Sequence, residues 1–262
     1  MTKVLAITNQ KGGVGKTTTS INLAASLSSV QQRVLLIDLD PQGNATMGSG
    51  VDKRDLQSSV YDILLGSKSI SETRLRAEAG KYDLLAANRE LAGAEIELVD
   101  LPNRESRLKD ALQQVIHEYD FILIDCPPAL NLLTLNGLCA AKSVMIPMQC
   151  EYYALEGLSD LVNTIRKVRA NLNPVLEIEG LLRTMFDPRN ALAQQVSEQL
   201  QEHFGNKVYR TIIPRNVRLA EAPSYGVPVL YHDKLSKGTQ AYLALANELL
   251  NNDTTAQIAA PA

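Results

Sequence analysis

Short apolar runs recur along the chain between stretches of helical periodicity, and they constrain the fold more than any other feature. Most are apolar at every position rather than at alternate positions, which is typical of strands covered on both faces in a parallel sheet. The expected strands are residues 3–8, 33–40, 82–87, 119–127, 143–149, 178–186 and 208–214. Between them, residues 155–172 place apolar side chains on one helical face, and Pro174 ends the pattern. The sequence therefore predicts an α/β fold, a doubly wound and mostly parallel sheet with helices on both faces.

The length and composition suit one large domain. The chain has 262 residues, of which 45% are hydrophobic, enough for a substantial core. It contains no long linker rich in Gly, Ser or Pro and no internal repeat. We expect a single domain over residues 1–250 and a flexible tail over the small, polar residues 251–262.

Charge and cysteine usage narrow the class of protein. The three cysteines show no C-x-x-C spacing, which favours a reducing compartment without disulfides or a zinc site. The formal net charge of −3 argues against a surface coated in basic residues but permits a local basic patch. The N-terminus runs straight into the first expected strand, and no apolar run is long enough to span a bilayer. We expect a cytoplasmic protein.

One loop has the composition of a phosphate-binding site. Residues 9–19 read NQKGGVGKTTT and lie between the first expected strand and a helix expected from about residue 17 to 28. The loop ends as the pattern G-x-x-x-x-G-K-[ST] requires, but Gln10 stands where the leading glycine belongs, and a second lysine, Lys11, follows it.

Each part of this loop suits a nucleoside triphosphate. Gly12, Gly13 and Gly15 allow backbone N–H groups to point at phosphate oxygens. Lys16 is expected to reach the β- and γ-phosphates, and the Thr17 hydroxyl to bind Mg²⁺. A Gly-rich turn with an incidental lysine is the alternative, but the position between strand and helix argues against it.

A dinucleotide-binding loop is a second alternative, because Gly13-Val14-Gly15 begins a G-x-G pattern. That pattern needs a third glycine, and Thr18 occupies its position. The loop is better interpreted as a nucleoside-triphosphate site.

Three carboxylates follow expected strands. Asp125 ends an apolar run at the position expected for a Walker B acid, and Asp38 and Asp40 end the second strand. The carboxyl ends of parallel strands meet at the edge where the phosphate loop lies. These acids are therefore candidates for holding a metal and a water, although ordinary strand-ending carboxylates remain the alternative.

Four segments together resemble the ParA/Soj partition ATPases, which belong to the deviant Walker A class that also contains MinD. The segments are KGGVGKTTT, LLIDLDPQGNAT, DFILIDCPP and TIIPRNVRLAEAPSYGVPV. The likeness runs from Lys3 to about Leu250. The loop specifies the class, and the other segments point to the ParA branch.

This resemblance implies roles for individual residues. Lys11 matches the lysine that reaches the partner's phosphates in a nucleotide-sandwich dimer, and it is a catalytic candidate together with Lys16 and Asp40. Asp40 matches the aspartate that positions or activates the attacking water. Asp125 would hold Mg²⁺ through a water, and Asp38 would lie in its outer shell. The implied nucleotide-binding set is Lys11, Gly12, Gly13, Val14, Gly15, Lys16, Thr17, Thr18, Pro214 and Asn216, with the last two at the adenine.

The resemblance also implies a function. It predicts a weak Mg²⁺-dependent ATPase whose ATP-bound homodimer binds double-stranded DNA without sequence preference on the nucleoid. A ParB-like, centromere-bound partner would stimulate hydrolysis and release the dimer, which drives segregation of a chromosome or plasmid. The phosphate loop begins near residue 10, so no N-terminal helix-turn-helix domain is expected.

Basic residues gather in the C-terminal third. Arg189 and Arg218 match family positions linked to DNA binding. Lys207, Arg210, Arg215, Lys234 and Lys237 lie nearby, with only Glu221 and Asp233 opposing them between residues 207 and 237. For the lysines and Arg210, a solvated charged surface is the open alternative.

Three other classes of protein fit the sequence less well. A MinD-like ATPase acting at a membrane would need a basic amphipathic C-terminal helix, and residues 241–252 contain no Lys or Arg, so no membrane partner is expected. An iron–sulfur protein would use cysteines to bridge a dimer, whereas Cys126, Cys139 and Cys150 are interpreted as small buried residues. A metabolic P-loop enzyme would show substrate-binding insertions, and none is identified.

Overall fold

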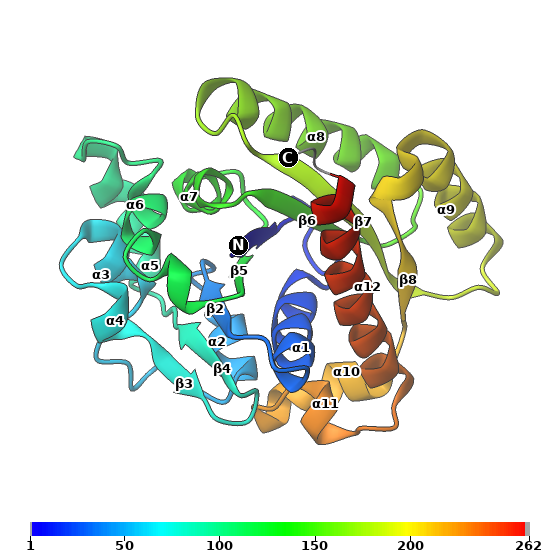
Figure 1. The fold of residues 1–262 in the computed structure, drawn as a ribbon, viewed down its shortest axis with the longest axis horizontal. Coiled ribbons are helices and arrows are strands. Elements are labelled where there is room, and N and C mark those ends of the chain that lie inside the picture. Colours follow the sequence, from blue (N-terminus) through cyan, green and yellow to red (C-terminus); the bar gives the residue numbers. More distant parts are fainter. Residues whose placement is uncertain (1, 260–262) are drawn as a thin grey trace.

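The computed structural model describes residues 2–259, with side chains described for residues 2–252. Its centre is an eight-stranded sheet in the order β3-β4-β2-β5-β1-β6-β7-β8 (Figure 1). The strands are β1 (Lys3–Ile7), β2 (Val34–Asp38), β3 (Leu75–Ala77), β4 (Tyr82–Leu85), β5 (Phe121–Asp125), β6 (Ser143–Met148), β7 (Glu177–Phe186) and β8 (Val208–Pro214).

The pairing of the strands confirms the predicted fold class. Every pair is parallel except β3 with β4, which is antiparallel. All seven expected strands are present, with ends that differ by a few residues at most. The eighth, β3, was not predicted, because it has only three residues and exposes Leu75 and Arg76 at the edge of the sheet.

Helices cover both faces of the sheet (Figure 1). The α-helices are α1 (Lys16–Ser29), α2 (Asn44–Gly48), α3 (Val60–Leu65), α4 (Ile70–Thr73), α5 (Leu91–Glu97), α6 (Arg107–Leu112), α7 (Leu132–Ala140), α8 (Ala154–Asn171), α9 (Ala191–Phe204), α10 (Val217–Glu221), α11 (Val229–His232) and α12 (Lys237–Ala259). Short 3₁₀ turns are η1 (Leu98–Asp100), η2 (Ile116–Glu118), η3 (Gly205–Lys207) and η4 (Ala222–Tyr225).

The two faces have separate cores, and successive side chains of β1 point into different ones. Val4 and Ala6 join the core that includes residues of α3 and α5 to α9. Leu5 and Ile7 join the core made with α1, α2 and α10 to α12. Burial on both faces explains why the strand sequences are apolar at every position.

The C-terminal helix α12 is longer than expected. It continues to Ala259, into the stretch predicted to be a tail, while residues 260–262 lie outside the described part of the chain. Its residues Tyr242, Leu245 and Leu249 are buried against the sheet. Within the described residues, none of the helices combines the length and hydrophobicity needed to cross a membrane.

We predict that Gly137→Ala lowers the free energy of unfolding by about 1–3 kcal/mol, because α7 has no room for a methyl group there. A Cβ at Gly137 would lie 2.8 Å from Cys126 Sγ and 3.2 Å from Leu39 Cδ1. The matched control is Gly157→Ala in α8, where a Cβ meets nothing within 4 Å. The control should gain about 0.5–1 kcal/mol, because alanine reduces the entropy of the unfolded chain. Urea unfolding measures both, and equal effects would contradict the packing argument.

Candidate active site

The phosphate loop joins β1 to α1 and is fixed from the side by β7. Gly13 and Gly15 have φ angles of 74° and 88°, in the left-handed region that favours glycine. Thr184 at the end of β7 donates its hydroxyl to the carbonyl oxygen of Val14 at 2.7 Å. Helix α1 begins at Lys16, so its free N–H groups and positive dipole end meet the loop. These features suit the loop backbone to an anion.

Lys16 is folded into this loop rather than extended into solvent. The residue is 7% exposed, and its Nζ donates to the carbonyl oxygen of Lys11 at 3.1 Å. Burial lowers the pKa of Lys16, while the nearby charges of Asp125 and Asp40 raise it. Its ammonium group thus lies between the loop and these two acids.

Asp125 lies fully buried at the end of β5 and ties that strand to α1. One carboxylate oxygen accepts a hydrogen bond from Thr17 Oγ1 at 2.8 Å, and the other accepts one from Ser20 Oγ at 2.8 Å. Burial, followed by the charge of Asp38, raises the pKa of Asp125. A hydroxyl beside a carboxylate at a phosphate loop is an oxygen donor set that suits Mg²⁺, which prefers few protein ligands together with phosphate and water.

Asp38 organises the loop that follows β2. Its side chain is fully buried and accepts hydrogen bonds from the Asp40 N–H at 3.1 Å and from both the N–H and the hydroxyl of Thr46 at 2.8 Å. Thr46 Oγ1 also accepts from the Ala87 N–H at 2.9 Å. The carboxylate of Asp38 therefore sets the path of the chain through Asp40. It is the register neighbour of Asp125, and its burial raises its own pKa to about 6.

Asp40 is half-buried and stands at the start of this loop. Its Oδ1 accepts the Gln42 N–H at 2.9 Å, and its carbonyl oxygen accepts the Gly43 N–H at 2.8 Å. These bonds fix the turn, and the charge of Asp40 acts on both Lys16 and Asp125. Asp40 and Asp125, predicted from two separate segments, thus both act on Lys16.

Lys11, by contrast, points outward. Its side chain is 45% exposed, and its Nζ forms an ion pair of 2.5 Å with Glu151 Oε2, whose side chain is 51% exposed. Glu151 lies between β6 and α8, far from Lys11 in the sequence. The two lysines of the loop therefore face different surroundings.

Pro214 and Asn216 line a cavity of about 160 Å³ beside the phosphate loop. Gly15 and Thr18 contribute its loop side, and Met185 closes it from the end of β7. Asn216 also caps α10, because its Oδ1 accepts the Leu219 N–H at 3.3 Å. The cavity brings the residues predicted to hold the adenine next to those predicted to hold the phosphates.

Arg189 and Arg218 lie in two segments that follow neighbouring strands, and neither lines this cavity. In the register of β7 and β8, Phe186 pairs with Pro214, so the chain leaves both strands at the same place. Arg189 follows β7, and Arg218 belongs to α10 after β8. Both are exposed, and both form ion pairs with carboxylates.

Sequence reasoning missed several residues of the site. Ser20 could have been found, because it lies one helical turn after Lys16 and faces the same way. Thr184 lies near the carboxyl end of an expected strand, which is also a usable signal. Glu151 and Met185 carry no local signal, because only the fold brings them to the loop.

A phosphate loop between β1 and α1, with acids at the ends of the adjacent strands, defines a P-loop nucleotide-binding protein. A family model described as "AAA domain" matches residues 2–178. The sporulation initiation inhibitor protein Soj of Bacillus subtilis is 55% identical over 252 residues, which cover 96% of this chain and 100% of that protein. The chromosome partitioning protein ParA of Myxococcus xanthus is 53% identical over 252 residues, 96% of this chain and 89% of that protein.

A solved structure extends the likeness to three dimensions. The crystal structure of cobyrinic acid a,c-diamide synthase from Mycobacterium smegmatis, with bound ADP and magnesium, has a TM-score of 0.86 and 39% identity. The match covers 98% of this chain and 97% of that one. With these similarities over nearly its whole length, the chain belongs to the ParA/Soj family of chromosome-partitioning ATPases.

We predict that Thr46→Val lowers the free energy of unfolding by about 1–3 kcal/mol, because a methyl group cannot donate to Asp38 or accept from Ala87. The site is fully buried, so neither partner regains a hydrogen bond from bulk water. Thr46→Ser keeps the hydroxyl and is the matched control. Chemical denaturation of both variants measures the difference, and a Val variant as stable as the Ser variant would contradict this account of the loop.

Proposed function

We propose that this chain is a Mg²⁺-dependent ATPase of a DNA partition system, which cycles between a free subunit and an ATP-bound dimer. The observation that carries the proposal is the opposite placement of the two loop lysines. Lys16 is buried near Asp40 and Asp125, whereas Lys11 is exposed and paired with the exposed residue Glu151. One lysine is therefore suited to the subunit's own nucleotide and the other to a nucleotide presented from outside.

ATP would bind along the loop with its adenine in the cavity next to Pro214 and Asn216. The N–H groups of Gly12 to Thr18 and the ammonium group of Lys16 would hold the phosphates. Mg²⁺, held by Thr17 and through a water by Asp125, would supply charge neutralisation at the β- and γ-phosphates. The ADP and magnesium bound to the cobyrinic acid a,c-diamide synthase, which shares this fold, support this choice of ligands.

Dimerisation would require Lys11 to exchange one anion for another. In the free subunit its ammonium group is paired with Glu151 at 2.5 Å. An exposed ion pair contributes only about 0.2–1 kcal/mol, so the triphosphate of a second subunit, with several negative charges, can replace it. This makes association depend on the γ-phosphate, much as an arginine supplied by a partner does in other nucleotide hydrolases.

Hydrolysis would depend on Asp40. Its loop is fixed by the hydrogen bonds of Asp38, and its carboxylate lies close enough to influence Lys16 and Asp125 electrostatically. We propose that Asp40 orients the attacking water, while Lys16 and Lys11 stabilise charge on the transferred phosphoryl group. Asp38 would act from the outer shell of the metal. Intrinsic turnover is expected to be slow, because the switch must wait for its partner.

The ATP-bound dimer would bind nucleoid DNA through Arg189 and Arg218 of both subunits. Doubling a basic surface strengthens DNA binding steeply, because each neutralised phosphate releases counterions. A ParB-like, centromere-bound protein would then stimulate hydrolysis and separate the dimer. The names of the bacterial relatives, chromosome partitioning ParA and Soj, support this assignment.

Substitution of Lys16 and of Lys11 should separate ATP binding from ATP-dependent dimerisation. Lys16→Ala is expected to weaken ATP binding by about 10- to 100-fold, because a charge-assisted hydrogen bond to phosphate is lost. Lys11→Ala should bind ATP nearly normally but stay monomeric. Titration with a fluorescent ATP analogue and light scattering with ATP and Mg²⁺ measure the two properties. Intact affinity in Lys16→Ala, or an ATP-dependent dimer of Lys11→Ala, would contradict the respective role.

The decisive experiment is ATP turnover with DNA alone, with a ParB-like protein alone, and with both. We expect slow turnover in the first two cases and strong stimulation in the third. Asp40→Ala is the matched variant, expected to bind ATP, form dimers on DNA and fail to respond. The absence of any stimulation by both partners together would overturn the partition assignment, and a monomeric Asp40→Ala protein in ATP would overturn the role of Asp40.

A further inference from the structure

The segments that follow β7 and β8 start side by side, and both carry exposed arginines. The pairing of Phe186 with Pro214 places the loop containing Arg189 beside the segment that contains Arg215 and Arg218. Asp187 is influenced by both segments, because the positive charges of Arg189 and Arg215 both lower its pKa. We call Arg189, Arg218 and their carboxylate partners the paired-arginine surface.

Arg189 is held by a carboxylate two residues before it. Its Nε and NH2 groups donate to the two oxygens of Asp187 at 3.0 and 2.8 Å, and its own backbone N–H donates to Asp187 at 3.0 Å. The Arg189 side chain is nevertheless 89% exposed. A two-pronged contact of this kind is the geometry that a guanidinium offers to a phosphate.

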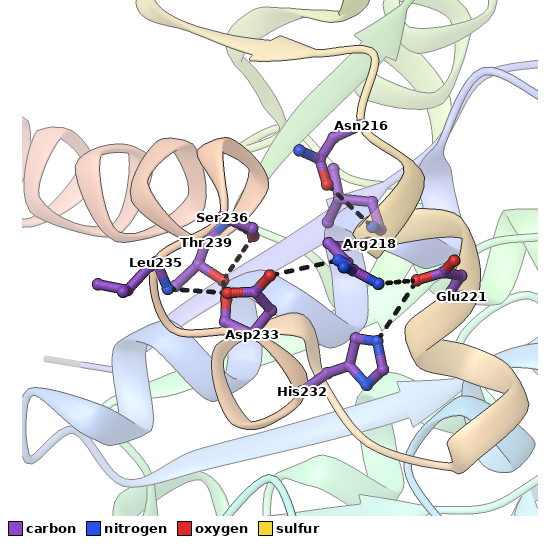
Figure 2. A network of polar contacts seen from close by, with 9 residues as sticks. Asn216, Arg218, Glu221, His232, Asp233, Leu235, Ser236 and Thr239 are labelled. Carbon is purple, nitrogen blue, oxygen red and sulfur yellow. Dashed lines mark hydrogen bonds and ion pairs between the residues drawn. The ribbon is translucent and has the colours of Figure 1, made fainter.

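Arg218 is held by two carboxylates from different segments. Figure 2 shows its guanidinium lying between Glu221 of α10 and Asp233, which follows α11. NH1 donates to Glu221 at 2.8 Å, and Nε lies 3.3 Å from Asp233. His232 Nε2 lies 3.7 Å from the same Glu221 oxygen, and its ring lies against Tyr225. In this cluster one guanidinium therefore faces two carboxylates.

Among the basic residues in and around the segments after β7 and β8, only some are paired with carboxylates. Across the part of the chain that the structure describes, no ion pair within 4.0 Å links a carboxylate to the other exposed basic side chains here, which are Lys207, Arg210, Arg215, Lys234 and Lys237. The two arginines that match the family's DNA-binding positions are the two with carboxylate partners.

We infer that Asp187, Glu221 and Asp233 occupy the phosphate-binding groups of Arg189 and Arg218 in the free subunit and thereby set a low affinity for DNA. The inference rests on the proposed DNA-binding function and adds the residues that regulate it. A phosphate of the DNA backbone must displace a carboxylate or share the guanidinium with it. Because exposed ion pairs are weak, the exchange is readily reversible, which suits a protein that must leave DNA after each cycle.

A carboxylate partner has two opposing effects on the binding of an arginine to DNA. Pairing orders a long side chain before DNA arrives, which favours binding, since a free arginine loses rotamer freedom on binding. Pairing also removes donors and adds negative charge beside the phosphates. Around Arg218 the negative charges outnumber the positive one, so we expect repulsion to dominate there. Around Asp187 two arginines, Arg189 and Arg215, face one carboxylate, so the effect of Asp187 should be smaller.

The test is Glu221→Gln, because the Glu221 carboxylate contacts Arg218 and His232 and the residue lies at the surface. In ATP and Mg²⁺, anisotropy of a labelled duplex of arbitrary sequence should show about 2- to 30-fold tighter binding by the dimer, which contains two copies of the pair. The slope of log K against log salt should also steepen, by up to about 0.9 per subunit, because Arg218 then releases its own counterion.

The control is Glu78→Gln, which makes the same charge change at an exposed position after β3, on the opposite edge of the sheet. The double variant Glu221→Gln/Arg218→Ala should bind no more tightly than Arg218→Ala, since Glu221 acts through that arginine. Weaker or unchanged binding by Glu221→Gln, an equal gain in Glu78→Gln, or a gain that survives in the double variant would each overturn the inference.

The wild-type protein separates this inference from the proposed function. Binding of wild-type protein to the duplex in ATP, without tightening in Glu221→Gln, leaves the proposed function intact and removes the inference. Failure of the wild-type protein to bind DNA in ATP at low salt overturns both. A gain in affinity without any change in salt slope would indicate a change in side-chain order rather than in charge, and would also count against the inference.

Discussion

The buried carboxylate of Asp125 is the interaction on which the rest of the site depends. It lies at the centre of the sheet, where β5 has β1 and β2 as its neighbours, and it accepts hydrogen bonds from Thr17 and Ser20 of α1. A buried carboxylate is costly unless its oxygens are satisfied, so these two hydroxyls fix how α1 begins. The position of the phosphate loop follows from that start. A single charge at a strand end thus joins the sheet to the anion-binding end of a helix.

Hydrogen bonds between side chains and the backbone hold the loops around the candidate site in place. Asp38 holds the turn at Asp40, Thr184 holds the loop at Val14, and Asn216 holds the start of α10. Each of these side chains lies at or just after the carboxyl end of a strand. These hydrogen bonds position the candidate site's edge of the sheet without a ligand, and such preorganisation reduces the entropy lost on binding.

Much of the fold and part of the site could be predicted from the sequence. Seven strands were recognised because double-sided burial requires apolar residues at every position, a strong signal. β3 escaped, because an exposed three-residue edge strand has no such pattern. Lys16 and Thr17 were predicted from the local spacing of the loop motif, and Asp125 was predicted from its place at the end of an apolar strand. The partners Glu151 and Met185 were not, because their roles arise only when distant segments meet.

The charges on the surface were predicted with less success than the loop. The sequence indicated a basic region in which Glu221 and Asp233 were the opposing residues, but their position relative to Arg218 depends on how α10 and α11 fold against each other. Ion pairs between segments have no local sequence pattern.

The start of α10 has a further consequence. Asn216 lines the cavity proposed for adenine, and Arg218, two residues later, lies on the outer surface. Asn216 and Arg218 are less than one helical turn apart. A substitution in this segment that alters the nucleotide cavity is therefore expected to shift the outer surface as well. Evolution and protein engineering would have to change the proposed nucleotide and DNA contacts of this segment together.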